Sequence, residues 1–228
     1  MIVSIMAAHP EVVAFDIIGT VFSMEPMRAE LVALGLQPMA LDLLYTAALR
    51  DMFALAGTST FAPFQSVLEG CLDELLAMEG LAVPAERKRA VLGMMKALPA
   101  YEDAKAAFRV LADAGIRIFA LSNGATATTR GLLEAADLDG LVEQVLSVED
   151  VNLSKPRPEV YLHAVQAAGV TPGEMALVAA HPWDVHGAKI ADLTGAYVAR
   201  GRPFSPVLKA PDITGETLLN VAHGLARL

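Results

Sequence analysis

The chain has 228 residues, of which 54% are hydrophobic and 19% are charged. This composition excludes a disordered chain, which needs low hydrophobicity and high net charge, and it allows one or two domains with a sizeable core. The 17 Lys and Arg residues against 26 Asp and Glu residues give a net charge of −9. So acidic a chain argues against nucleic acid or an anionic membrane as a partner, and local groups must hold any anionic substrate.

No targeting or membrane-spanning segment is predicted. Residues 1–10 are too short and too poor in basic residues for a signal peptide, and no run of about 18 apolar residues occurs. We therefore expect a cytoplasmic protein that does not bind a membrane. The single cysteine, Cys71, can form no internal disulfide and is interpreted as a small buried hydrophobic residue.

The first predicted element is a buried strand at Val12–Phe15, which stops at Asp16 and is followed by a turn at Gly19 and Thr20. From about residue 24 to 98, apolar residues recur at i, i+3 and i+4, and glycine or proline separates the segments. This pattern predicts four helices, at residues 28–34, 41–55, 64–78 and 85–96. No strand is expected in this stretch.

After Pro99 strands and helices alternate along the chain. Strands are predicted at residues 116–121, 142–147, 175–180 and 196–199. Helices are predicted at residues 103–114, 126–136, 158–168, 183–193 and 214–225. Such alternation is typical of βαβ units around a parallel sheet.

The predicted fold class is therefore α/β, a Rossmann-like parallel sheet with an all-helical cap subdomain inserted after the first strand. We expect residues 1–22 and 99–228 to form the core and residues 23–98 to form the cap. Ligands of open parallel sheets bind outside the carboxyl ends of the strands, so a cap at this point would cover the binding site.

Polar residues stand at the ends of the first two predicted strands. Asp16 ends the first strand, where it is either a turn residue or a carboxylate nucleophile. The second strand runs into Ser122-Asn123-Gly124. These residues can cap the next helix, and they can also help its N-terminus to bind an anion.

Two further charged residues stand near the starts of later helices. Lys155 precedes Pro156 and a predicted helix, where a cation opposes the helix dipole, so it is either functional or solvated. Asp184 lies in the first turn of another predicted helix, a position that the dipole favours for an acid. Alternatively, Asp184 orients Lys155, positions water or holds Mg²⁺.

In this order, the four blocks resemble the haloacid dehalogenase superfamily, and most of all its (S)-2-haloacid dehalogenase branch. The matching segments are Phe15-Asp16-Ile17-Ile18-Gly19-Thr20, Leu121-Ser122-Asn123-Gly124, Lys155-Pro156 with Tyr161, and Trp183-Asp184-Val185-His186-Gly187-Ala188. The resemblance implies that Asp16 attacks the halogen-bearing carbon of a small 2-haloacid and expels halide. Water then hydrolyses the aspartyl ester to a 2-hydroxy acid. It also implies no metal, no organic cofactor and a possible homodimer.

The resemblance further implies roles for individual residues. Thr20, Lys155 and Asp184 would act with Asp16 and position the water. His181 stands where the family has an asparagine, and it would act as general base on the ester or bond to the backbone at the helix start. The expected substrate contacts are Ile17, Ile18, Tyr45, Arg50, Ser122, Asn123, Gly124, Tyr161 and Trp183.

Two positions depart from the patterns of the superfamily. Its phosphatases carry a second acid two residues after the nucleophile, where this chain has Ile18, which cannot protonate an alkoxide. Its dehalogenases carry a cap arginine that receives the halide, where this chain has Tyr45, and Arg50 or Arg28 is the candidate substitute. The first departure favours dehalogenation and the second opposes it.

Two other functions therefore stay open. One is a Mg²⁺-dependent phosphatase or phosphonate hydrolase of the same superfamily, with the metal at Asp16, Ile18 and Asp184. The other is a relative without catalytic activity, which intact Asp16, Lys155 and Asp184 argue against.

Overall fold

The computed structural model of the protein describes residues 9–228. The prediction that residues 1–10 hold no signal peptide thus falls mostly outside the described part of the chain. Among the described residues, no helix combines the length and the apolar character that crossing a bilayer requires.

One six-stranded parallel sheet forms the centre of the molecule, with the strand order β3-β2-β1-β4-β5-β6. The strands are β1 (Val12–Phe15), β2 (Arg117–Ser122), β3 (Gln144–Ser147), β4 (Met175–Ala179), β5 (Thr194–Val198) and β6 (Ile213–Gly215). Phe15 of the central strand β1 lies opposite Ala120 of β2 and Val178 of β4. The predicted α/β class with a parallel sheet is confirmed.

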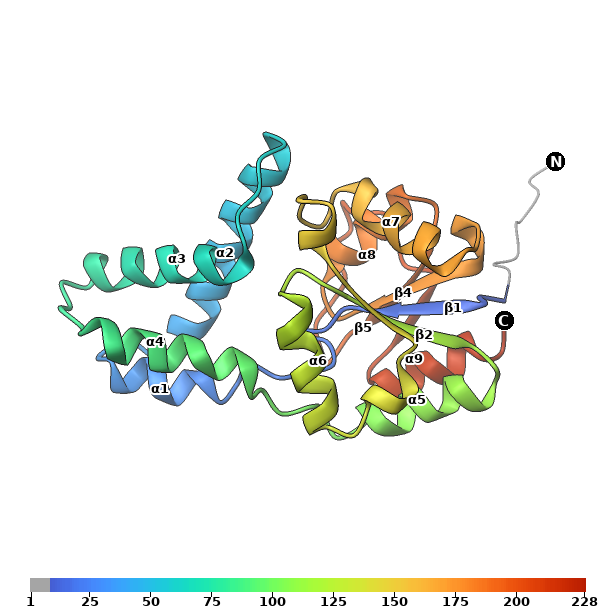
Figure 1. The fold of residues 1–228 in the computed structure, drawn as a ribbon, viewed down its shortest axis with the longest axis horizontal. Coiled ribbons are helices and arrows are strands. Elements are labelled where there is room, and N and C mark those ends of the chain that lie inside the picture. The colour runs from blue at the N-terminus through green and yellow to red at the C-terminus, as the bar shows by residue number, and fades with distance from the viewer. Residues whose placement is uncertain (1–8) are drawn as a thin grey trace.

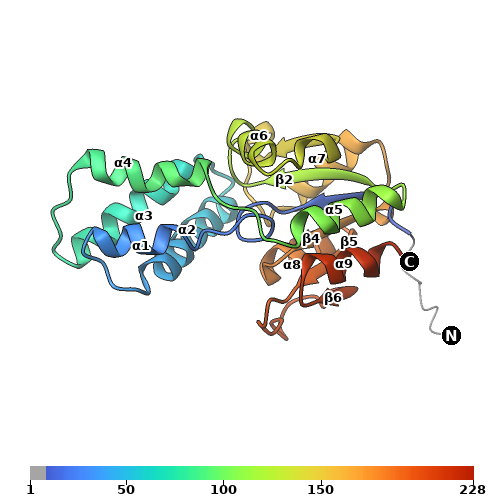
Figure 2. The same cartoon turned by 90° about the horizontal axis from the view of Figure 1, so that it is seen from below.

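Helices cover both faces of the sheet. They are α5 (Ala104–Asp113), α6 (Thr126–Ala135), α7 (Pro158–Ala168), α8 (Pro182–Ile190) and α9 (Leu218–Leu225). Since side chains alternate along a strand, Val13 and Phe15 pack with α5, α6 and α9, while Val12 and Ala14 pack with α7 and α8. Figure 1 shows α7 and α8 above the sheet, and Figure 2 shows α5 and α9 on the other face.

Four more helices lie beyond the carboxyl ends of the strands. They are α1 (Met27–Ala33), α2 (Ala40–Gly57), α3 (Phe64–Met78) and α4 (Ala85–Gly93). We call α1 to α4 the cap, and the sheet with its flanking helices the core. Figure 1 shows the cap as a separate group of helices beside the end of the sheet to which β1 points. The cap therefore covers the edge at which the predicted site residues stand.

The chain passes from core to cap and back at one place. The outgoing and returning segments pair there, since Ser23 N–H donates to Pro99 O and Tyr101 N–H donates to Val21 O, each at 2.9 Å. A bridge between Phe22 and Ala100 completes this pair. We call the paired segments the neck.

Some predicted boundaries differ from the structure. The helix expected at residues 85–96 ends at Gly93 and continues as a 3₁₀ turn, Met94–Lys96. The expected helix at 214–225 was wrong at its start, because residues 213–215 form the edge strand β6 and α9 begins at Leu218. Thr217 caps α9 by accepting a hydrogen bond from the N–H of Asn220 at 3.1 Å.

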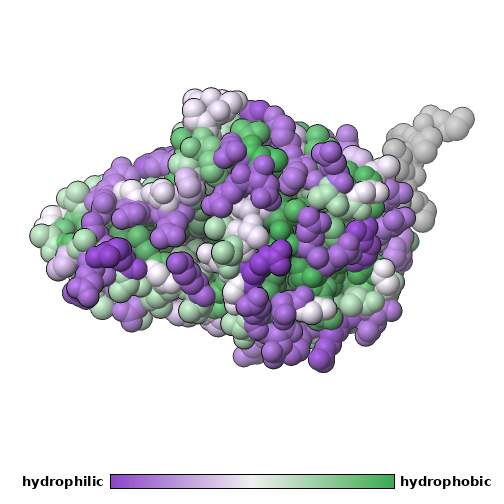
Figure 3. Space-filling view, in the orientation of Figure 1, coloured by the Kyte–Doolittle hydropathy of each residue, from purple (hydrophilic) through white to green (hydrophobic). Residues whose placement is uncertain are grey.

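Figure 3 shows hydrophilic side chains over both cap and core, with apolar residues between them. Apolar side chains with large exposure are scattered over several elements, and the largest exposures are those of Val207, Met78 and Met39. Cys71 is buried in α3 and unpaired, as predicted. Its side chain contacts Asp51 of α2 at 3.4 Å.

Candidate active site

Asp16 stands at the carboxyl end of β1, where the chain makes a tight loop beneath the cap. Gly19 makes this loop possible, because its φ of +82° is a backbone conformation that side-chain-bearing residues rarely adopt. The loop brings Thr20 back to Asp16, so that Thr20 Oγ1 donates to Asp16 Oδ2 at 2.6 Å. The N–H of Ala180, just past β4, in turn donates to Thr20 Oγ1 at 2.9 Å. One carboxylate oxygen is thus fixed by two neighbouring strand ends.

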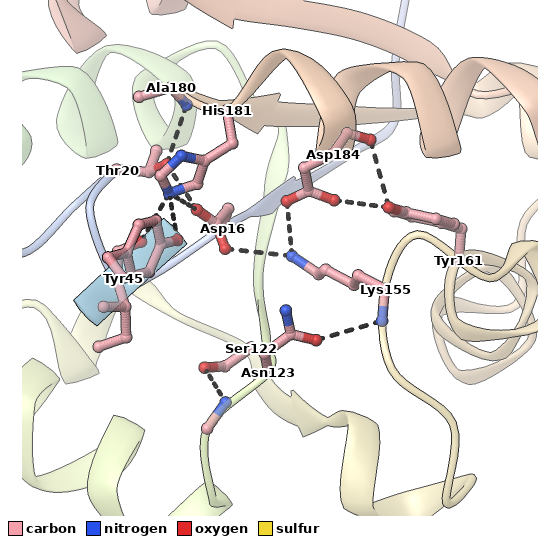
Figure 4. A network of polar contacts seen from close by, with 12 residues as sticks. Asp16, Thr20, Tyr45, Ser122, Asn123, Lys155, Tyr161, Ala180, His181 and Asp184 are labelled. Carbon is pink, nitrogen blue, oxygen red and sulfur yellow. Dashed lines mark hydrogen bonds and ion pairs between the residues drawn. The ribbon is translucent and has the colours of Figure 1, made fainter. Parts of the chain in front are cut away.

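Lys155 joins the two predicted acids. Its Nζ donates to Asp16 Oδ1 at 3.2 Å and to Asp184 Oδ2 at 2.8 Å (Figure 4). Lys155 and Asp184 are 0% exposed, and Asp16 is 5% exposed. The structure therefore brings together the acid, the lysine and the second acid, which lie far apart in the sequence.

Burial and charge oppose each other in this trio. Burial lowers the pKa of Lys155, but the carboxylates of Asp184 and Asp16 outweigh it, so the pKa of Lys155 is raised above its ordinary value. Burial raises the pKa of Asp184, and the nearby charge of Lys155 only partly offsets this. The trio holds an excess negative charge beneath the cap, and Asp184 is a stronger base than an exposed aspartate.

Tyr161 supports Asp184 from below. Its hydroxyl donates to Asp184 Oδ1 at 2.6 Å and also lies 3.2 Å from the carbonyl oxygen of Asp184. The Tyr161 side chain is 0% exposed, so the expectation that it contacts substrate was wrong. Gly187 allows this arrangement, because a Cβ there would lie 2.5 Å from the Tyr161 hydroxyl. Tyr161 positions Asp184 and touches no open space.

Replacing Tyr161 with Phe should therefore lower the free energy of unfolding by about 1–3 kcal/mol, because a buried carboxylate loses a hydrogen-bond donor. The measurement is urea unfolding of wild type and Tyr161→Phe. The matched control is Tyr197→Phe, which also removes a tyrosine hydroxyl, but one that donates to the uncharged carbonyl oxygen of Arg202 at 3.0 Å. Equal stability of Tyr161→Phe and wild type would show that the contact with Asp184 contributes nothing.

The segment Ser122-Asn123-Gly124 shapes the loop between β2 and α6. Ser122 Oγ accepts a hydrogen bond from the N–H of Gly124 at 2.9 Å, which leaves its own hydrogen free to be donated. Asn123 Oδ1 accepts from the N–H of Lys155 at 3.2 Å. Figure 4 shows the amide nitrogen of Asn123 on the side of Lys155 and Asp16. The asparagine thus fixes the lysine backbone and presents two donors toward the acid.

A small cavity lies where this loop meets the cap. Its volume is about 100 Å³, and we call it the inner cavity. Core residues Ile18, Ser122 and Gly124 line one side, and cap residues such as Phe64 and Leu68 line the other. The predicted substrate contacts at Ile18, Ser122 and Gly124 therefore face open space. The Ile17 side chain does not, because it is 0% exposed within the apolar core, so its expected substrate contact can come only from its backbone.

His181 and Tyr45 close the other side of Asp16. His181 Nε2 lies 3.0 Å from the Ile18 carbonyl oxygen, 3.0 Å from the Tyr45 hydroxyl and 3.6 Å from Asp16 Oδ2. A carbonyl oxygen only accepts, so the contact with Ile18 requires a hydrogen on Nε2. A nitrogen that donates in this way cannot take a proton from water. The geometry thus supports the backbone-bonding interpretation of His181 and takes Nε2, the nitrogen beside Asp16, out of the general-base role.

Close packing holds this histidine in place. A Cβ on Gly19 would lie 2.8 Å from His181 Nε2, so only glycine leaves room for the ring. Trp183 stacks on the His181 ring with centroids 5.4 Å apart, and Phe53 of α2 meets Trp183 edge-on at 5.3 Å. The predicted site residue Trp183 thus packs between His181 and the cap. Phe53 was missed, because nothing in the sequence sets it apart from other apolar residues of α2.

Arg50 does not belong to this site, contrary to the prediction. Its guanidinium bonds to Asp51 at 2.7 Å and to Glu74 of α3 at 2.8 Å, and its side chain is 57% exposed. Five residues along a helix correspond to about 140° beyond one full turn, so Arg50 and Tyr45 point in different directions. Arg28 is likewise held by carboxylates, those of Glu25 and Asp42.

A larger cavity lies beyond Tyr45 and His181, between cap and core. Its volume is about 310 Å³, and we call it the outer cavity. It is lined by Gly19, Ser23, Met24, Glu25, Arg28, Leu41, Asp42, Tyr45, Thr46, Tyr101, Ala180, His181, Ala199, Arg200 and Arg202. The arginines at residues 200 and 202 were not predicted, because they follow a short strand with no motif around them.

The site does not fit a divalent cation. Each carboxylate oxygen of Asp16 and Asp184 accepts a hydrogen bond from Thr20, Lys155 or Tyr161. The third expected ligand position, Ile18, has no side-chain ligand atom, and its carbonyl oxygen accepts from His181. This donor set opposes the Mg²⁺-dependent alternative.

Comparison with known proteins agrees with this geometry. A model of the haloacid dehalogenase-like hydrolases matches residues 10–192. The chain is 34% identical over 128 residues to (S)-2-haloacid dehalogenase 1 of Pseudomonas sp. (strain CBS-3), a match that covers 56% of each chain. It therefore spans little more than half the length of that relative.

Solved structures resemble the chain over nearly its whole length. An L-2-haloacid dehalogenase matches with a TM-score of 0.89 and 26% identity, covering 96% of this chain and 99% of the other. The Xanthobacter autotrophicus L-2-haloacid dehalogenase with chloropropionic acid covalently bound matches with a TM-score of 0.84 and 24% identity, covering 94% and 97%. With its fold and the family match over residues 10–192, the chain belongs to the haloacid dehalogenase-like hydrolases.

Proposed function

We propose that the protein is a 2-haloacid dehalogenase that uses Asp16 as its nucleophile. An oxygen of Asp16 attacks C2 of the substrate, the new C–O bond forms as the C–halogen bond breaks, and the electron pair leaves with the halide. Water then adds to the ester carbonyl carbon and loses one proton. The bond between that carbon and the ester oxygen breaks, the second proton of the water passes to the leaving oxygen, and the products are a 2-hydroxy acid and the restored Asp16 carboxylate. The observation that carries this proposal is the buried trio in which Lys155 bridges Asp16 and Asp184.

The Lys155 ammonium lies 3.2 Å from Asp16 Oδ1 and holds this oxygen in place. Thr20 holds the other oxygen, so the carboxylate has one orientation. A fixed, charged and nearly dry carboxylate is the state that attacks a carbon centre. Asp184, whose pKa burial raises, is the acceptor that we assign to the proton of the hydrolytic water.

Donors for the substrate carboxylate lie beside the nucleophile. Within residues 9–228, the backbone N–H groups of Ile17 and Ile18 donate no hydrogen bond. The Ser122 hydroxyl has a free hydrogen, and the Asn123 amide nitrogen lies nearby. These groups supply the positive potential that the acidic trio lacks, and they bind an anion without a metal.

The Ile18 side chain argues against phosphate ester hydrolysis. Breaking a phosphate ester releases an alkoxide, which needs a proton from a nearby acid, and isoleucine has none. A halide leaves as a stable anion and needs no proton. The absence of an acid at this position therefore fits a carbon–halogen bond.

Tyr45 is the hydrogen-bond donor that we assign to the departing halide. Burial and the charges of Asp16 and Asp184 raise the pKa of Tyr45 well above its ordinary value, so the phenol keeps its hydrogen. His181 Nε2 directs its hydrogen at the Ile18 carbonyl oxygen, so it offers no lone pair to the phenol and the phenolic hydrogen stays available.

Replacing Tyr45 with Phe should lower kcat/KM for (S)-2-chloropropionate by about tenfold or more, because the leaving anion loses its donor. The loss should be smaller for (S)-2-bromopropionate, since bromide leaves more readily and accepts hydrogen bonds more weakly. Halide release from both substrates measures this, and the bromide compound serves as the internal control. Equal losses for the two leaving groups would contradict the assignment of Tyr45.

The test of the proposed function is halide release from (S)- and (R)-2-chloropropionate, chloroacetate, bromoacetate and fluoroacetate, in EDTA and in Mg²⁺. We expect release from at least one of these compounds that EDTA does not reduce. Release of phosphate from phosphate esters in Mg²⁺, without any halide release, would establish the phosphatase alternative. No product from either class would support a relative without catalytic activity.

A further inference from the structure

We propose that the outer cavity binds a second carboxylate of the substrate, so that the protein acts on 2-halo dicarboxylic acids. This proposal rests on the proposed function and specifies its substrate class. The outer cavity adjoins the nucleophile, because Tyr45, His181 and Gly19 line it and His181 Nε2 lies 3.6 Å from Asp16 Oδ2. A substituent on C2 would reach this space only past the Tyr45 and His181 side chains, which form its wall toward Asp16.

The charged residues that line the outer cavity are three arginines and two acids, so their sum is positive. Its two carboxylates, those of Glu25 and Asp42, are both engaged by Arg28. Arg202 forms no ion pair within the described part of the chain, and its side chain is exposed. One guanidinium is therefore left to meet an anion.

Arg200 also lines the outer cavity and contacts the loop that carries Thr20. Its Nη2 donates to the carbonyl oxygen of Thr20 at 3.0 Å, and its Cζ lies 3.5 Å from the ring centroid of Tyr101. Asp103 is 3.8 Å away. Arg200 is thus held rigidly against the loop that carries Thr20, and it adds positive potential beside Arg202 without being free to move.

The rest of the lining suits a carboxylate. Ser23, Thr46 and Tyr101, which carry hydroxyl groups, line the same cavity, and Met24 and Leu41 offer apolar contact for a short methylene chain. A planar guanidinium pairs with a carboxylate through two parallel hydrogen bonds. A single unpaired cation matches one negative charge, which favours a carboxylate over a doubly charged phosphate.

The test compares two substrates of equal chain length, 2-bromoglutarate and 2-bromopentanoate, in wild type and Arg202→Gln. We expect kcat/KM of wild type to be higher for 2-bromoglutarate. Arg202→Gln should lower that value about tenfold, because a charge-assisted hydrogen bond is lost, and should leave 2-bromopentanoate within about twofold. Arg109→Gln, on the exposed side of α5, is the matched control for loss of one positive charge.

A binding measurement separates this proposal from the proposed function. Glutarate should raise the Tm of wild type more than pentanoate or inorganic phosphate does, and Arg202→Gln should abolish the difference. That result, without halide release from any compound, would sustain the carboxylate site and reject dehalogenation. Equal kcat/KM for the two bromo acids in wild type, unchanged by Arg202→Gln, would reject the site and sustain dehalogenation. A larger shift with phosphate than with glutarate would overturn the choice of a carboxylate.

Discussion

Asp16→Asn should abolish halide release, with a loss in kcat/KM of at least about four orders of magnitude, because the variant has no carboxylate to form the ester. The amide retains the shape of the side chain, and Thr20 and Lys155 remain in place beside it. The loss should therefore come from chemistry and not from misfolding. Halide release is measured in EDTA with the best substrate of the panel.

The matched control is Asp113→Asn, an exposed aspartate at the end of α5 that lies outside the site. Its activity should equal that of wild type. Mass spectrometry of Asp16→Asn mixed with substrate should show no added mass on the protein. Residual halide release above one part in about a hundred would mean that another group attacks C2, and the assignment of Asp16 would be withdrawn.

The second large effect is expected on stability. Lys155→Met retains most of the buried aliphatic chain but removes the charge between two carboxylates. Removing one partner of a buried ion pair costs about 3–5 kcal/mol, because the remaining charge is buried without compensation. Urea unfolding at neutral pH measures this loss, and halide release should vanish in the same variant.

The stability loss of Lys155→Met should depend on pH. Burial raises the pKa of Asp184 in the folded protein, and without Lys155 only the hydrogen bond from Tyr161 still opposes this rise. A carboxyl group whose folded pKa is raised loses stability as pH rises from its unfolded pKa through the folded value. The difference between variant and wild type should therefore be small in acid and grow toward neutral pH. A difference that stays constant from pH 4 to 7 would show that packing, not charge, causes the loss.

The sequence alone located the acids and the lysine of the site for a simple reason. Asp16 ends β1 and Asp184 follows β4, and these strands are neighbours in the sheet. The carboxyl ends of neighbouring parallel strands meet at one edge, so residues placed there come together whatever the loop details. The parallel sheet could be predicted in the same way, from the alternation of strands and helices.

Side-chain direction was less accessible from the sequence. Tyr161 was expected to line the substrate space, but its place on α7 turns its hydroxyl toward Asp184. Arg50 and Tyr45 share α2, yet only Tyr45 faces His181. The His181 hydrogen bond depends on the position of the Ile18 carbonyl oxygen. The loop at Gly19 sets that position, and the hydrophobic periodicity of the sequence does not predict the shape of such a loop.

Edge strand β6 could not be predicted from its pattern. It has only three residues, Ile213–Gly215, and pairs with β5 alone. So short a segment shows no alternation that distinguishes it from the first turn of a helix. Its existence depends on the partner strand and not on its own residues.

The neck makes the cap a replaceable module. Val21 and Tyr101 lie next to each other, as do Ser23 and Pro99, so the core chain departs and returns at adjacent points. A helical segment of any length, or a short hairpin, can join these points without altering β1 or β2. Evolution, or an engineer, can therefore exchange the helices above the site while Asp16, Lys155 and Asp184 stay on the core. The charged trio and most of the roof above it are encoded on separate stretches of chain.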